Sequence, residues 1–344
     1  MNLRFWYLKL RPKRPFRISR ETTYEKTTVL VGLEEDGLWG LGEAVPYPFY
    51  GDTLDAVVGF LKSAQNVLKN FSSFELHNVE KELHRLAGRN FSAKDGIMDA
   101  MFDILGKRIG QPVWRMLGIP RQPVPTSYTI GIGSLDEMVA DLEEHPNFQV
   151  YKVKLGTDKD LEIVKELAKR TDRPLRIDAN AAWTPKEALR KIQFFADLGK
   201  IELVEQPLPP DDIDGLKFLK ERSSLPIFVD ESVMTSKDVV RLADAVDGIN
   251  IKLPKSGGLL EAFRMIHVAR AHGLKIMIGC MLQSSLGIAA AAQIAPLVDY
   301  VDLDGSLLLE ADPCVGLEVD ENGFIHLSEK PGLGIECPSI EIKL

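Results

Sequence analysis

Three acidic residues close short apolar runs in the middle of the chain. Asp178 ends the run LRID, Glu205 ends LVE and Asp230 ends IFVD. Carboxylate oxygens from separate rigid elements are ligands that suit Mg²⁺ or Mn²⁺, which keep open positions for water or substrate. Each acid could instead cap the helix that follows it, but three acids in the same relative place favour a shared metal site. The sequence has no HExxH motif and no Cys/His pair of zinc spacing, so zinc is disfavoured.

Lysines accompany these acids. Lys152 and Lys154 lie two residues apart in YKVKL, so on a strand both side chains point the same way, and Lys252 ends the run GINIK. These lysines could merely neutralise the carboxylates. They could also transfer protons, since a lysine acts as a base once burial and neighbouring cations lower its pKa. Two lysines on opposite faces of one carbon would then invert it through an enediolate that the metal stabilises.

The elements that must position these residues repeat along the chain. After Pro123, short apolar runs alternate with amphipathic helical stretches about every 25 residues, and no GxGxxG phosphate loop occurs. This pattern predicts an α/β fold, a (β/α) barrel over residues 123–311, with its active site at the carboxyl ends of the strands. The expected strands are 127–132, 150–155, 175–179, 202–205, 227–230, 248–252, 275–279 and 300–303, and the clearest expected helices are 159–170, 185–198, 236–245 and 259–272.

The first third of the chain has a different order of predicted strands and helices. Strand-like runs up to residue 42 precede helical patterns over 55–89 and 93–108, so residues 1–122 are predicted to form an α+β capping domain. The tail, residues 312–344, has no helical period and is expected to complete that domain. A chain of 344 residues suits one barrel with a smaller unit beside it.

Composition and charge exclude several classes of function. The net charge of −8 comes without a basic stripe, so nucleic acid is not expected as a partner. The sequence contains no apolar run of roughly 18 residues, so no membrane span is expected. The three cysteines, Cys280, Cys314 and Cys337, are odd in number and form no CxxC pair. They are expected to be reduced, which argues against a disulfide framework and makes the cytoplasm the expected location.

Taken together, the strand-end motifs resemble those of one family. KVK (152–154), DAN (178–180), EQP (205–207), DES (230–232) and NIKLPKSGG (250–258) resemble the enolase superfamily, in the muconate-lactonising-enzyme subgroup, and are most similar to dipeptide epimerases such as the L-Ala-D/L-Glu epimerases. The resemblance implies a modified TIM barrel with Mg²⁺ bound by the residues Asp178, Glu205 and Asp230. It implies Lys154 and Lys252 as the acid/base catalysts, Lys152 as a substrate-carboxylate contact that lowers the pKa of Lys154, and Thr129 as a substrate contact.

The last predicted strand carries a pair of acids. Asp302 and Asp304 project to the same face and would repel each other unless a cation lay between them. The resemblance implies that this pair holds the α-ammonium of a dipeptide, and it places Cys280 near the substrate. The alternatives are a helix cap or surface turn for the acids and an inert buried thiol for Cys280.

The resemblance leaves the substrate open. Thr23 stands where an arginine would favour an acidic side chain, while Tyr47, Phe49 and Tyr50 allow an apolar one or simply pack the cap on the barrel. Rival activities within the subgroup are a muconate-type cycloisomerase, an o-succinylbenzoate synthase and an N-acylamino acid racemase. A rival outside it is a catalytically inactive metal-binding barrel, and a barrel reductase using NADPH fits less well. A homo-oligomer is compatible with the resemblance.

Overall fold

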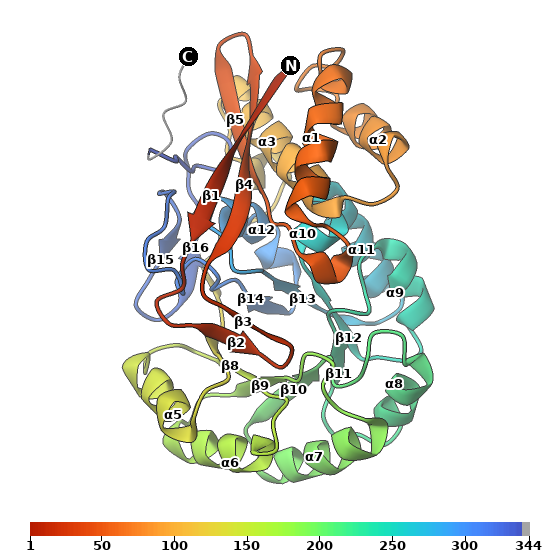
Figure 1. The fold of residues 1–344 in the computed structure, drawn as a ribbon, viewed down its shortest axis with the longest axis vertical. Coiled ribbons are helices and arrows are strands. Elements are labelled where there is room, and N and C mark those ends of the chain that lie inside the picture. Colours follow the sequence, from red (N-terminus) through yellow and green to blue (C-terminus); the bar gives the residue numbers. More distant parts are fainter. Residues whose placement is uncertain (339–344) are drawn as a thin grey trace.

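An eight-stranded parallel sheet, curled into a barrel, forms the centre of the computed structural model, which describes residues 1–338 (Figure 1). Every strand expected after Pro123 is present, so the predicted fold class is confirmed. The two end strands approach each other through a hydrogen bond from Ser127 N to Val301 O of 3.1 Å, which nearly closes the barrel. The strands are β7 (Tyr128–Ile130), β8 (Tyr151–Lys154), β9 (Leu175–Asp178), β10 (Ile201–Glu205), β11 (Ile227–Val229), β12 (Gly248–Ile251), β13 (Lys275–Gly279) and β14 (Tyr300–Asp302).

Amphipathic helices surround the barrel and connect its strands. In α6, for example, Ile163, Val164 and Leu167 are buried at helical spacing while the charged residues between them face outward. Strands β12 and β13 are joined by two helices in succession. The helices are α5 (Leu135–Glu144), α6 (Asp160–Arg170), α7 (Pro185–Asp197), α8 (Ile213–Lys220), α9 (Ser236–Leu242), α10 (Leu253–Ser256), α11 (Leu259–Ala271), α12 (Ser285–Ala292) and the 3-10 turn η2 (Ala295–Leu297).

The interior of the barrel is apolar at one end. Leu203, Phe228 and Met277 are fully buried and pack with Tyr300. Gly248 makes room for this cluster, because a Cβ at that position would lie 2.3 Å from the ring of Phe228. This apolar cluster and the buried Arg176, whose guanidinium lies 5.0 Å from the centre of the Tyr300 ring, fill the amino-terminal end of the barrel. The acidic groups at the ends of the strands lie at the opposite end.

A capping unit lies against the barrel. Its antiparallel sheet has the order β1 (Asn2–Leu10), β4 (Lys26–Glu35) and β5 (Leu38–Ala44). Helix α3 (Phe91–Ile109) packs closely on β5, where a Cβ at Gly42 would lie 2.1 Å from the carbonyl oxygen of Gly96. The remaining elements are a hairpin of β2 (Phe16–Ile18) and β3 (Glu21–Thr23), which extends over the barrel (Figure 1), the turn η1 (Pro48–Tyr50), and helices α1 (Leu54–Leu68), α2 (Leu76–Leu86) and α4 (Val113–Met116).

The tail touches both units. Strands β15 (Glu318–Val319) and β16 (Phe324–His326) form a small sheet with β6 (Val124–Pro125). Further along, Leu333 N donates to the carboxylate of Asp103 on α3 at 2.8 Å. The domain division at residues 122 and 311 stays a prediction, and residues 339–344 of the expected tail lie outside the described part of the chain.

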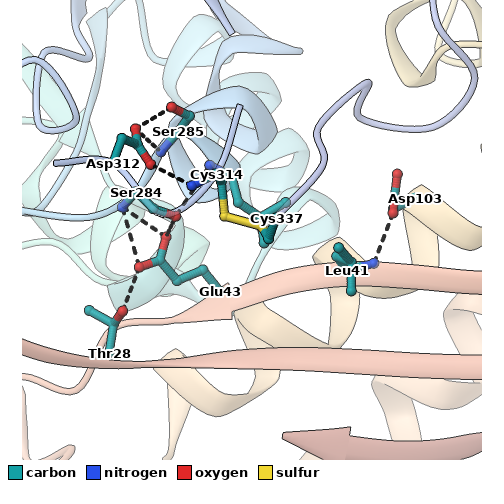
Figure 2. Close-up of a disulfide and its surroundings, with 10 residues drawn as sticks. Thr28, Leu41, Glu43, Asp103, Ser284, Ser285, Asp312, Cys314 and Cys337 are labelled. Atoms are coloured by element: carbon teal, nitrogen blue, oxygen red, sulfur yellow. Dashed lines mark hydrogen bonds between the residues drawn. A yellow bond between two sulfur atoms is a disulfide. The ribbon is translucent and has the colours of Figure 1, made fainter. Parts of the chain in front are cut away.

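The expectation that all three cysteines are reduced is wrong for two of them. Cys314 and Cys337 form a disulfide, and Cys280 is free. The two partners are 23 residues apart, but the tail folds back so that Val315 and Glu336 form a bridge beside them. The pairing was invisible in the sequence because it depends on this reversal of the chain. Figure 2 shows the disulfide next to Asp312, whose carboxylate accepts hydrogen bonds from Ser285 N at 3.0 Å and from Cys314 N. Within residues 1–338, no helix has the length and apolar character needed to cross a membrane.

Candidate active site

A pocket lies between the mouth of the barrel and the cap. It contains most of the residues singled out in the sequence, whereas Lys152, Asp178 and Glu205 lie deeper in the barrel. The cap contributes Phe16, Ile18, Arg20, Glu21, Thr23, Lys26, Tyr47 and Tyr50 to the lining, and the barrel contributes Thr129, Lys154, Asn180, Asp230, Lys252, Cys280, Met281, Leu282, Asp302, Asp304, Gly305 and Leu308.

The three candidate metal ligands end neighbouring strands. Asp178 ends β9, Glu205 ends β10 and Asp230 follows β11, and all three side chains are buried. Glu205 and Asp178 are opposite each other in the parallel ladder. Burial opposes ionisation of Asp178, but the ammonium groups of Lys154 and Lys152 outweigh it and hold the pKa of that carboxyl below its usual range.

Lys152 joins several carboxylates at the centre of the barrel. Its Nζ lies 3.1 Å from Asp178, 2.8 Å from Glu205 and 2.7 Å from Asp302. Burial would lower the pKa of Lys152, yet these three acids, Asp302 first, raise it well above its usual value. Lys152 and Lys154 both reach Asp178 inside the barrel, so the prediction that their side chains point the same way is confirmed. Lys152 acts here as a buried counter-ion that links the candidate metal ligands to the acid pair on β14.

The two candidate catalytic lysines approach from opposite sides. Lys154 lies on β8 and Lys252 directly follows β12, four strands away in a barrel of eight. Each is bound to a carboxylate: Lys154 Nζ lies 2.6 Å from Asp178, and Lys252 Nζ lies 2.7 Å from Asp230. Burial opposes the charge on Lys252, but Asp230 raises its pKa above the usual value. The charge nearest to Lys252 is thus an anion, which favours the ammonium form of this lysine.

A further lysine was missed. Lys255 is fully buried, and its Nζ donates to the carbonyl and to the carboxylate of Asp230, both at 2.5 Å. It stands in the motif NIKLPKSGG, one helical turn after Lys252. That spacing, at the start of a short helix after a strand, is the signal that could have revealed it.

The loops after the strands are shaped by unusual backbone conformations. Gln206 has φ 38°, and its side-chain oxygen accepts from the backbone N–H of Asp230 at 3.0 Å and of Ser232 at 3.2 Å. Asn180 has φ 43° and donates from its side chain to Glu231. Asn tolerates the left-handed region better than most residues. Gln206, the second residue of EQP, thus holds the backbone of Asp230. Asn180, the third residue of DAN, holds the carboxylate of Glu231.

The donor set at the mouth fits a hard divalent cation. It offers carboxylates from three neighbouring rigid elements. Oε1 of Glu205 accepts from Asn250 at 2.8 Å, while Oε2 has no hydrogen bond from residues 1–338 although Lys152 Nζ lies close. Burial and then the charge of Asp178 raise the pKa of Glu205 to about 7. A cation beside Glu205 would relieve this mutual repulsion.

A second group of potential ligands is already occupied by a side chain. Asp141, Glu144 and His145 have ligand atoms within 4.8 Å of one another. Arg14 lies 3.3 Å from Asp141 and 2.6 Å from Glu144, so its guanidinium takes the place that a cation would need.

The acid pair on β14 is asymmetric. Asp302 accepts from Lys152 at 2.7 Å and from Ser127 Oγ at 2.5 Å, whereas Asp304 accepts from the backbone N–H of Thr129 at 2.6 Å. Burial opposes ionisation of Asp302, but Lys152 lowers its pKa. Burial and the charge of Asp302 raise the pKa of Asp304 to about 7. Both acids are buried and line the pocket, so the alternative of a surface turn is excluded.

An arginine of the cap binds residues in the barrel loops beside this site. Arg20, in the turn between β2 and β3, forms an ion pair of 2.7 Å with the buried Glu231 and donates to the carbonyl of Asn180 at 3.2 Å. Its guanidinium lies 4.2 Å from the centre of the Phe49 ring, and Nε donates to Tyr47 Oη. The aromatic residues of the second cap loop therefore hold Arg20 and help to close the pocket.

Comparisons with known proteins agree with this geometry. Residues 5–118 match the mandelate racemase/muconate lactonizing enzyme N-terminal domain, and residues 135–339 match the enolase C-terminal domain-like family. An L-Ala-D/L-amino acid epimerase from Maribacter sp. is 40% identical over 329 residues, which cover 94% of this chain and 95% of that protein.

Two solved structures have the same fold. The substrate-liganded L-Ala-D/L-Glu epimerase from Bacillus subtilis superposes with a TM-score of 0.94 at 34% identity, covering 97% of this chain and 98% of that one. The dipeptide epimerase from Enterococcus faecalis, complexed with Mg and L-Leu-L-Tyr, also gives 0.94, at 32% identity, covering 97% and 99% of the two chains.

Proposed function

This chain belongs to the enolase superfamily, within the mandelate racemase/muconate lactonizing enzyme family, and from that membership we propose that it is a Mg²⁺-dependent dipeptide epimerase. It would invert the α-carbon of the C-terminal residue of a dipeptide. The observation that carries the proposal is the placement of Lys154 and Lys252 on opposite walls of one pocket, with the acid pair Asp302 and Asp304 beside them.

Asp178, Glu205 and Asp230 would hold the metal. Bound there, Mg²⁺ would supply positive charge that stabilises the negative charge developing on the substrate carboxylate and offsets the acidic field holding Lys252 as an ammonium. Mn²⁺ prefers the same oxygen donors and is a reasonable substitute.

The lysines would move the proton. One lysine, in its neutral form, removes the α-proton from one face of the carbon, and the other, as an ammonium, delivers a proton to the opposite face. Because the two groups approach from strands four apart in the ring, the new C–H bond forms on the side opposite to the broken one. The configuration is thereby inverted. Lys152 would orient the substrate carboxylate from below.

The acid pair would fix the other end of the substrate. Asp302 already binds Lys152 and Ser127, so its position is set by the barrel. Asp304, held by the N–H of Thr129, presents carboxylate to the pocket and would accept the α-ammonium of the dipeptide. A buried ammonium needs a counter-charge of this kind.

The test is incubation of the protein with a panel of L,L-dipeptides in deuterated buffer containing Mg²⁺. We expect deuterium to enter the α-position of the C-terminal residue while the L,D isomer accumulates. A lack of exchange across the panel would contradict the proposal and favour the inactive barrel.

Asp304→Asn separates the rivals that share this fold. The ammonium contact predicts that this variant loses dipeptide turnover by about 10- to 100-fold, since hydrogen bonds to charged groups contribute about 1.5–3 kcal/mol. A cycloisomerase, an o-succinylbenzoate synthase or an N-acylamino acid racemase has no substrate ammonium, so its activity would survive Asp304→Asn.

A further inference from the structure

A buried amide lies inside the barrel, below its mouth. Asn250 is on β12, two residues before Lys252, so alternation along the strand puts both side chains on the same face. Asn250 is fully buried, and its Nδ2 donates to Oε1 of Glu205 at 2.8 Å. The nitrogen is the amide atom that faces Glu205, because an ionised carboxylate can only accept. Asn250 is therefore a neutral donor fixed on one of the candidate metal ligands.

The two oxygens of Glu205 have different surroundings. Oε1 is held by the amide of Asn250. Oε2 accepts no hydrogen bond from residues 1–338, although Nζ of Lys152 lies 2.8 Å away. One oxygen of the carboxylate is thus fixed, and the other is left for a further partner. A carboxylate held in this way offers a metal ion a single oxygen in a fixed orientation.

The neighbouring strand leaves space for this amide. Gly279 ends β13 beside Asn250, and a Cβ at that glycine would lie 2.6 Å from Oδ1 and 2.8 Å from Nδ2 of the amide. Oδ1 itself is buried and has no hydrogen-bond partner within residues 1–338. An unpaired buried oxygen is destabilising, and an apolar side chain of similar size would avoid it. Packing alone therefore does not account for an asparagine at position 250.

The other two candidate metal ligands are held by charged groups. Asp178 accepts from Lys154 at 2.6 Å, and Asp230 accepts from Lys255 at 2.5 Å. Glu205 instead receives its hydrogen bond from an amide. Glutamate also has one more rotatable bond than aspartate, so the orientation of its carboxylate depends more on an outside contact.

We infer that Asn250 is a positioning residue for the metal site: its amide holds Oε1 of Glu205 and so leaves Oε2 as the oxygen that binds Mg²⁺. This inference rests on the proposed function, in which Glu205 is a metal ligand. Loss of a hydrogen bond to a ligating carboxylate lowers metal affinity by about 10- to 100-fold. Because the amide is neutral, its removal changes the orientation of Glu205 without changing the charge of the site.

The experiment measures Mg²⁺ binding to the substrate-free protein by isothermal titration calorimetry, so it does not depend on turnover. Asn250→Leu removes the donor and nearly keeps the side-chain volume. We expect it to raise the Kd for Mg²⁺ by about 10- to 100-fold.

Gln293→Met is the matched control. Gln293 is a buried amide that donates to the carbonyl of Ala289 and accepts from the N–H of Trp114, and it lies outside the pocket lining. Its replacement also removes a buried amide, but it should leave the Kd for Mg²⁺ within about twofold of the parent value.

A second variant perturbs the same amide from the neighbouring strand. The methyl group of Gly279→Ala would press on the side chain of Asn250, so Mg²⁺ binding should weaken by up to about tenfold. If the methyl group acts through the amide, Gly279→Ala should have no further effect on the Kd in an Asn250→Ala background. This pair of measurements decides the matter even where Asn250→Leu does not fold.

The outcomes separate this inference from the proposed activity. A Kd for Mg²⁺ in Asn250→Leu within about twofold of the parent value, or an equal rise in Gln293→Met, would overturn the inference. So would an undiminished effect of Gly279→Ala in the Asn250→Ala background. If the parent protein binds Mg²⁺ but epimerises no dipeptide, the proposed activity fails while the role of Asn250 stands. If the parent protein binds no Mg²⁺, the metal site fails and this inference fails with it.

Discussion

Two groups of buried acidic side chains, one at the barrel mouth and one on helix α3, have opposite surroundings. At the barrel mouth, Asp178 and Asp230 lie against lysines at 2.5–2.7 Å. On helix α3, Asp95 and Asp99 are as deeply buried, but one oxygen of Asp95 and both oxygens of Asp99 find no hydrogen-bond partner within residues 1–338. Asp178 and Asp230 at the mouth therefore have cationic partners that favour their charged form, whereas Asp95 and Asp99 on α3 lack such partners among residues 1–338.

The pKa shifts follow this contrast. Lysines lower the pKa of Asp178 and Asp230 against the effect of burial. Burial, followed by neighbouring acids, raises the pKa of Asp95 and Asp99 well above the usual value. Only the mouth maintains a concentrated charge, which is what cation binding and proton transfer require.

Two other buried acids, Glu43 on β5 and Asp103 on α3, bind backbone and hydroxyl groups of neighbouring elements. Glu43 accepts from Thr28 Oγ1 and Ser284 Oγ, both at 2.6 Å, and Asp103 accepts from Leu41 N at 2.8 Å (Figure 2). These carboxylates act as fixed acceptors between β5, α3 and the start of α12. Their role is structural, since they position backbone and hydroxyl groups.

The largest effect is expected at the two lysines of the mouth. Lys154→Met and Lys252→Met should each lower the rate of epimerisation by about 100- to 10,000-fold, the usual contribution of a positioned acid or base. The rate is measured by polarimetry with an L,L-dipeptide, and circular dichroism serves to verify folding. Epimerisation within tenfold of the parent rate in either variant would contradict the two-lysine mechanism.

A smaller but substantial effect on stability is expected from the central counter-ion. Lys152→Met leaves Asp178, Glu205 and Asp302 without their shared ammonium, which should cost about 3–5 kcal/mol of unfolding free energy in EDTA. Added Mg²⁺ should reduce the loss, because the proposed metal site includes two of these acids, Asp178 and Glu205.

Lys107→Met is the matched control from the α3 group. Lys107 lies 2.6 Å from Asp103, but it is partly exposed, and Asp103 keeps two backbone N–H donors. Its loss should cost no more than about 1 kcal/mol and should not respond to Mg²⁺. Equal losses of unfolding free energy in Lys152→Met and Lys107→Met would contradict the view that charge pairing contributes more at the mouth than on α3.

The smallest effect is expected at the acids without lysines. Near pH 4 these carboxyls are neutral in the folded chain and about half ionised in the unfolded chain. As the pH rises, the unfolded chain ionises first because the folded pKa values are raised, so the folded state loses relative stability. The Asn side chain of Asp99→Asn cannot ionise. The unfolding free energy of this variant relative to the parent should therefore be on the order of 1–2 kcal/mol higher at pH 8 than at pH 4. Urea unfolding at the two pH values measures this, and a constant difference would contradict it.

The sequence predicted the parts of the site that a regular repeat places. All eight strands were expected, and Asp178, Glu205 and Asp230 end three neighbouring ones because parallel strands deliver their last residues to the same rim. Alternation along β8 placed both of its lysines inside. These inferences needed only local periodicity.

The missed features depend on contacts between distant parts of the chain. Lys26 reaches the pocket because the cap sheet lies across the barrel mouth, and no local pattern indicates that orientation. The disulfide of Cys314 and Cys337 needs the tail to reverse its direction. Odd cysteine counts and wide spacing do not reveal such a reversal.

The most direct test of the central claim is deuterium exchange by the two single-lysine variants, each given the L,L and the L,D isomer of one dipeptide in deuterated buffer with Mg²⁺. The proposed mechanism places Lys154 and Lys252 on opposite sides of the α-carbon, so each variant should exchange one isomer only, and the two variants should exchange opposite isomers. Exchange of the same isomer by both variants, or of both isomers by either one, would contradict the account.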